Sequence, residues 1–148
     1  MEIVAYYLRY VAIYCMFGLT MALSAIDKVL NSPPEWFQEQ FQDTLVASVP
    51  GLEISWRLAG ALEIAVAVLV IVSIVMREFL PGAAKPWLKA ALGVAAVTFM
   101  MLGVGQRISA EFDGASSLFF YFGATMATLL VVFYDERARD TSGEPATT

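Results

Sequence analysis

The chain has 148 residues, of which 59% are hydrophobic and only 16% charged, and its net charge is −5. About a quarter of the residues of a soluble domain are charged, so this composition indicates a membrane protein. The negative charge argues against nucleic acid as a partner, because nucleic-acid binding requires a basic face. With no histidine and one cysteine, Cys15, an internal disulfide, a histidine-ligated haem and a Cys/His zinc site are excluded.

Apolar segments recur four times along the chain, and each is close to the ~20 residues that a membrane-spanning helix needs. They cover residues 3–26, 54–76, 86–105 and 116–134. We therefore predict an all-α fold, an integral membrane four-helix bundle. One domain would extend over residues 1–135, and the polar segment 136–148 would be a disordered tail.

The first span begins with several tyrosines around Arg9, namely Tyr6, Tyr7, Tyr10 and Tyr14. Aromatic residues near the end of a spanning helix usually form a belt at the membrane interface. Tyr14 is deep enough to line an interior surface instead. Further along, Gly18 begins a run of small residues that allows a neighbouring helix to approach closely.

A short amphipathic helix is predicted between spans one and two. Ser32 and Glu35 have the spacing of a capping box. Beyond them, aromatic and aliphatic side chains alternate with acids and amides at helical spacing, with Trp36, Phe37, Phe41 and Leu45 on the apolar side. Such a helix either lies in the membrane interface or folds over the mouth of the bundle as a lid.

Span two carries the most informative residue, Glu63. If the helix enters the hydrocarbon near Ile54, this carboxylate lies about 13 Å along it, where burying a charge costs roughly 2.5–3.5 kcal/mol. Arg57 points about 120° away from Glu63 on an ideal helix, so the two are poor partners. We expect Glu63 to pair with Lys28 or Arg107, or to be protonated. Gly60 lies between the two charges and allows close helix packing.

Spans three and four add milder polar groups. Span three closes with Gly103, Gln106 and Arg107 on one face, and the glycine again favours close packing. Span four carries a polar stripe that we expect to face inward and to hydrogen-bond to neighbouring helices. Its members are Ser117, Tyr121, Thr125 and Thr128.

The basic residues predict the orientation of the bundle. Arg9, Arg77, Lys85, Lys89, Arg137 and Arg139 fall at one end, and Lys28, Arg57 and Arg107 at the other. Basic residues concentrate on the cytoplasmic side, so both termini are expected in the cytoplasm. The polar cluster of Lys28, Arg57, Glu63, Gln106 and Arg107, with Tyr121, would then form a pocket near the outer leaflet that binds a ligand or moves protons.

Lys28 at the end of span one, the amphipathic segment after it, and Gly60 and Glu63 in span two together resemble the DoxX family. The resemblance covers about residues 3–135. It implies a small four-helix protein of the bacterial or archaeal cytoplasmic membrane, with Lys28, Gly60 and Glu63 at the matching positions. Members are associated with quinone-linked sulfur oxidation and with oxidative-stress complexes.

The resemblance implies a membrane subunit of a quinone-linked redox complex, with a quinone as the ligand and a soluble or membrane redox subunit as the partner. We expect no metal and no covalent cofactor. The alternative is a non-catalytic accessory or scaffold subunit whose buried charges only orient the bundle. A transporter of lipids or small solutes is a third hypothesis, for which four spans without an internal repeat would have to oligomerise.

Overall fold

The structure, a computed structural model, describes residues 1–142, with side chains up to residue 137, and this part of the chain is helical without strands. Its helices are α1 (Glu2–Tyr14), α2 (Thr20–Leu30), α3 (Glu35–Phe41), α4 (Leu45–Ser48), α5 (Leu52–Val75), α6 (Pro86–Ile108) and α7 (Phe112–Ser142), and a π-helical turn, η1 (Cys15–Leu19), joins α1 to α2. The predicted all-α fold with four spans is confirmed.

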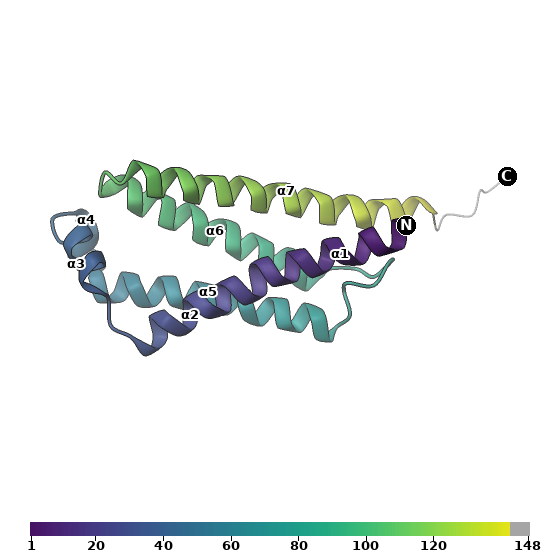
Figure 1. Ribbon diagram of the computed structural model, residues 1–148, viewed down its shortest axis with the longest axis horizontal. Coiled ribbons are helices and arrows are strands. Elements are labelled where there is room, and N and C mark those ends of the chain that lie inside the picture. The colour runs from purple at the N-terminus through teal and green to yellow at the C-terminus, as the bar shows by residue number, and fades with distance from the viewer. Residues whose placement is uncertain (143–148) are drawn as a thin grey trace.

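In the part of the chain that the structure describes, four continuous helices are long and apolar enough to cross a membrane: Glu2–Leu30, Leu52–Val75, Pro86–Ile108 and Phe112–Arg137. They pack mainly in chain order, α2 on α5, α5 on α6 and α6 on α7. α3 and α4 lie at one end of the bundle, and α1 begins at the other end close to the last turns of α7 (Figure 1). We call these the α3 end and the N-terminal end.

The core of the bundle consists of apolar side chains from all four spans. Its largest cluster contains Tyr10, Ile13, Phe17, Met21, Val66, Val70, Leu88, Ala91, Leu92, Ala95 and Val132. Tyr10 is 1% exposed, so it belongs to this core and not to the interfacial belt that the sequence suggested. The reason is that Tyr10 falls on the face of α1 that meets α6 and α7, where its hydroxyl finds a carboxylate partner, Asp135.

The first span contains a π-helical turn, η1, at its middle, and Gly18 lies in this turn. A methyl group added at Gly18 would meet Cγ1 of Val70 at 2.8 Å, closer than side chains pack. The first span and α5 therefore approach each other through the bare backbone of this residue.

α3 begins later than the capping box predicted. It starts at Glu35, with Pro34 as its extended N-cap and no side-chain cap, so Ser32 does not cap it. The reason is the Pro33–Pro34 pair, because a residue that precedes proline is pushed out of the helical conformation.

The polar segment after the fourth span is also different from the prediction. We expected disorder from residue 136, but α7 continues through Ser142. The backbone N–H of Lys85 and the ammonium of Lys89 both donate to the Glu136 carboxylate and hold this part of the helix against α6. The rest of the predicted tail lies outside the described residues.

Replacing Gly18 by alanine is expected to destabilise the bundle by about 1–3 kcal/mol, because the added methyl overpacks the contact with Val70. Gly123→Ala is the matched control, since a methyl group there meets nothing within 4 Å and alanine is the better helix former. Thermal unfolding in detergent measures the effect, and equal midpoints for the two variants would contradict this account.

Candidate functional site

Lys28 of α2 and Glu63 of α5 form a buried ion pair toward the α3 end. The Lys28 ammonium donates hydrogen bonds to both carboxylate oxygens of Glu63, each at 3.0 Å, and to the Ser24 hydroxyl at 2.6 Å. The side chain of Glu63 is only 5% exposed and that of Lys28 only 13%. An ammonium group has three N–H donors, so these three bonds use its full capacity.

Gly60 makes this pair possible. A methyl group at Gly60 would lie 2.9 Å from Cβ of Lys28, so α2 and α5 touch at this point. Gly60 precedes Glu63 by three residues and therefore lies on the same side of α5. The close approach of the two helices allows the long lysine side chain to reach the carboxylate without leaving the bundle.

Aromatic residues cover the pair at the α3 end. The Lys28 ammonium lies 5.2 Å from the ring centroid of Trp56, a cation–π contact. The indole N–H of Trp56 donates to the backbone carbonyl of Asn31 at 3.2 Å. Phe37 of α3 packs edge-on against Trp56 with ring centroids 5.1 Å apart, and Trp36 makes a similar edge contact at 6.2 Å. α3 is thus packed against α5 on the outer side of the ion pair.

A single amide connects α3 to the third span. The Gln40 side chain donates to Oε1 of Gln106 at 2.6 Å and to the Ser109 hydroxyl at 2.9 Å. Phe41, next to it, is buried. Two positions were predicted for this helix, one in the membrane interface and one over the mouth of the bundle. Its contacts with α5 and α6 favour the position over the bundle end.

The remaining candidates do not join Lys28 and Glu63 in one pocket. Arg57 is exposed and bonds Glu53, one turn away on α5, at 2.7 Å. Arg107 lies over the ring of Phe112 at 4.2 Å. Tyr121 is 43% exposed and contacts Phe99 at 5.6 Å between centroids. Arg57 points about 120° away from Glu63 on α5, and Arg107 and Tyr121 contact aromatic rings of the α6–α7 pair, so the predicted cluster separates into local contacts.

The polar stripe of α7 also differs from the prediction. The hydroxyls of Ser117, Thr125 and Thr128 donate to backbone carbonyls four residues earlier in the same helix. A serine or threonine hydroxyl that has no partner on a neighbouring helix donates its hydrogen bond to a backbone carbonyl of its own helix. These three hydroxyls therefore do not hydrogen-bond α7 to another helix, although Thr125 is buried and Tyr121 contacts Phe99 of α6.

Gly103 serves the α6–α7 contact. A methyl group there would meet the Phe119 ring at 3.0 Å. Gly18, Gly60 and Gly103 thus each lie where two helices touch, and only Gly60 adjoins the ion pair.

A second polar network, which the sequence pattern did not predict, lies at the N-terminal end. Glu78 is 2% exposed and accepts hydrogen bonds from the Ser73 hydroxyl and from the backbone N–H groups of Trp87 and Leu88. It therefore caps the start of α6 from the preceding loop, where free N–H groups favour an anion. The Tyr14 hydroxyl extends this network to the first span through a 2.8 Å bond with Ser73.

The same end holds two ion pairs that attach α7. Arg9 binds Asp135 at 2.6 Å, and the Tyr10 hydroxyl donates to the same carboxylate at 2.7 Å. Lys89 binds Glu136 at 2.6 Å. In the sequence, these contacts are indicated only by Asp135 and Glu136, two acids that end the last span among basic residues. This pattern indicates an ion pair but not its partner.

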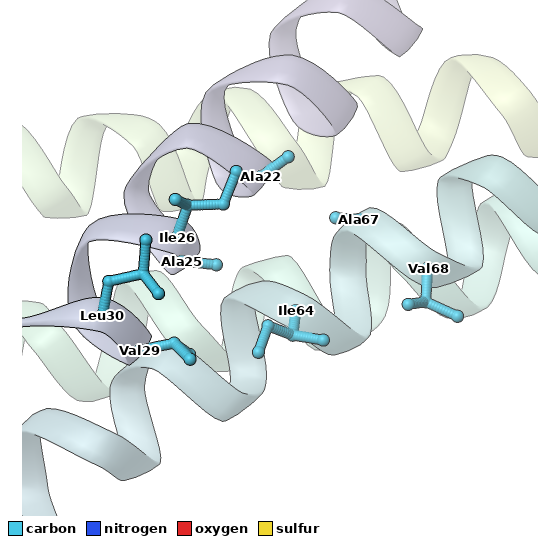
Figure 2. Close-up of a pocket in the computed structure, with 8 residues that line it drawn as sticks. All are labelled: Ala22, Ala25, Ile26, Val29, Leu30, Ile64, Ala67 and Val68. Carbon is cyan, nitrogen blue, oxygen red and sulfur yellow. The ribbon is translucent and has the colours of Figure 1, made fainter.

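The lipid-facing side of the α2–α5 contact contains an apolar groove of about 290 Å³. Figure 2 shows its lining from both helices: Ala22, Ala25, Ile26, Val29, Leu30, Ile64, Ala67 and Val68. Ile64 directly follows Glu63 and points about 100° away from it on α5, whereas Ala67 lies one turn from Glu63 on the same side of the helix. The groove therefore adjoins the ion pair along the α2–α5 contact.

Among the described residues, no group of three or more acidic or cysteine side chains is arranged to hold a metal ion. Comparison of the chain with family models, with curated proteins and with solved structures finds no match.

Replacing Glu63 by glutamine is expected to cost about 3–5 kcal/mol of stability, because the Lys28 charge remains buried without its counter-ion. The control is Glu53→Gln, which breaks the exposed pair with Arg57 and is expected to cost at most about 1 kcal/mol. Unfolding midpoints in detergent measure both changes.

The double variant Lys28→Met/Glu63→Leu provides the complementary measurement. It removes both charges and is expected to recover most of the stability lost in Glu63→Gln, since apolar groups replace a buried ion pair at little cost. If the double variant is as unstable as the single one, the loss does not come from the unpaired charge.

Proposed function

We propose that the protein is a DoxX-like membrane subunit of a quinone-linked redox complex in a bacterial or archaeal cytoplasmic membrane. The observation that carries the proposal is the contact among Lys28, Gly60 and Glu63, the three residues of the resemblance, inside the span. An ionisable pair within a membrane is costly, and pairs that are kept there commonly mark ligand or proton pathways.

The chemistry of the pair suits an amphiphile with carbonyl groups. The Lys28 ammonium is a donor for a carbonyl oxygen, and the Glu63 carboxylate is a proton acceptor. A quinone supplies a two-electron acceptor that takes up protons on reduction. Because Lys28 already donates three bonds, a carbonyl would have to replace one oxygen of Glu63 or the Ser24 hydroxyl. The released carboxylate would then be free to take a proton.

The electron-transferring groups would belong to another chain. Nothing in the sequence resembles a nucleophile–base pair or a metal site, so this chain would supply the membrane anchor and the polar centre while a redox subunit supplies the electron carrier. Co-purification with a soluble or membrane redox subunit would support this division.

Both termini would face the cytoplasm. Arg9, Lys85 and Lys89 lie together at the N-terminal end, where the charged last turns of α7 also lie (Figure 1). Basic residues near span ends favour the cytoplasmic side. The ion pair of Lys28 and Glu63 would then lie in the outer half of the membrane.

One observation favours a second candidate, a non-catalytic accessory or scaffold subunit. All three donors of Lys28 and both oxygens of Glu63 are engaged within the chain, and aromatic residues cover them. A satisfied pair of this kind needs no ligand, and its role would then be to fix how α2 meets α5.

Quinone content distinguishes the two candidates. The wild-type protein, purified from membranes, is expected to retain a quinone that is extracted with organic solvent and detected by its near-ultraviolet change on borohydride reduction. Glu63→Gln is expected to lose most of it, because it removes the proton acceptor and alters the donor geometry of Lys28.

Glu39→Gln, an exposed acid on α3, serves as the control and should retain the quinone. The double variant Lys28→Met/Glu63→Leu keeps the fold without the charges. If this variant, correctly folded, retains as much quinone as the wild type, the redox proposal fails and the accessory role is preferred.

A further inference from the structure

The groove between α2 and α5 faces the bilayer, and a charged pair stands above it on α5. Arg57 precedes Ile64 by seven residues and Val68 by eleven, so all three lie on one face of the helix within about 40°. Glu53 lies one turn further toward the α3 end and binds Arg57. On this face of α5, the groove residues are therefore followed toward the α3 end first by the cation Arg57 and then by the anion Glu53.

The dimensions match one leaflet of a membrane. From Arg57 to Val68 the helix rises about 16 Å, which is close to half of the roughly 30 Å hydrocarbon core. The groove of about 290 Å³ is lined only by apolar side chains, from both helices. Such a lining suits a hydrocarbon chain of a lipid.

The order of the two charges points to one kind of headgroup. In a phospholipid the phosphate lies next to the glycerol, and an amine, where present, lies further out. Arg57 lies nearer the hydrocarbon and Glu53 further out. The pair is more than half exposed, so it contributes little to stability, and its members can exchange each other for ligand charges.

We propose that this surface is a binding site for an aminophospholipid of the phosphatidylethanolamine type. One acyl chain lies in the groove, Arg57 binds the phosphate, and Glu53 accepts hydrogen bonds from the ammonium group. Asp27, exposed on the same end of α2, makes the site less favourable for a lipid with net negative charge. The proposal goes beyond the redox function and does not depend on quinone binding, which concerns Lys28 and Glu63 and not Arg57 or Glu53.

The test uses the full-length protein, delipidated in detergent, with phosphatidylethanolamine, phosphatidylcholine or phosphatidylglycerol of identical acyl chains. Binding is measured by native mass spectrometry or by the rise in unfolding midpoint. Phosphatidylethanolamine is expected to bind about tenfold more tightly than phosphatidylcholine, whose methylated amine cannot donate hydrogen bonds to Glu53, and more tightly than phosphatidylglycerol.

Two surface variants keep the fold and separate the contacts. Arg57→Gln is expected to weaken phosphatidylethanolamine binding about tenfold, through loss of one charge-assisted contact. Glu53→Gln is expected to remove the preference over phosphatidylcholine. Arg107→Gln is the control, an exposed cation at the same end that lies over Phe112 and away from the groove, and it should bind as the wild type does.

Several results would overturn the proposal. Equal binding of the three lipids, unaffected by Arg57→Gln, would mean ordinary solvation by lipid. A preference for phosphatidylglycerol would assign the site to an anionic lipid. A dimer that forms without lipid and that Ile26→Cys cross-links through a disulfide between two copies would show that a second copy covers the groove.

Discussion

The buried ion pair between Lys28 and Glu63 is the interaction on which the arrangement of the first two spans depends. Each charge alone would be expensive inside a membrane, and together with Ser24 they satisfy one another completely. The pair also requires a fixed distance between α2 and α5, which Gly60 provides. A substitution that separates these helices therefore affects the packing and the charge compensation at the same time.

The bundle is held by polar contacts at both ends and by apolar packing between them. α5 contributes to both ends, with Glu63 near one and Ser73, which binds Tyr14 and Glu78, near the other. Between them, Val66 and Val70 are buried against the first span. The two polar networks are thus separated by an apolar layer. This layer argues against a continuous path for protons along α5 and limits any proton transfer at Glu63 to the half of the membrane on its own side.

The two faces of the α2–α5 contact have different chemistry. The inner face carries the charged pair under aromatic cover, and the outer face carries an apolar groove open to lipid (Figure 2). Small residues at the seam allow both to exist, because Gly60 admits the Lys28 side chain on one side and alanines leave space on the other.

The sequence by itself determined the membrane class, the four spans and the residue most in need of a partner. Hydropathy and length decide where helices cross a bilayer, because the backbone must satisfy its own hydrogen bonds there. The cost of an intramembrane carboxylate identified Glu63 in the same way. These are local properties of a segment, so they could be derived without knowledge of its neighbours.

Only the tertiary structure decided which helices meet and which charges pair. Lys28 and Arg107 were both possible partners of Glu63, and the close contact at Gly60 selects Lys28. The capping of α6 by Glu78, the attachment of Asp135 and Glu136, and the separation of Arg57, Arg107 and Tyr121 from the ion pair all depend on contacts between segments distant in the chain. Helical phase tells which residues share a face of one helix, but the neighbour opposite that face is set by how the whole bundle packs.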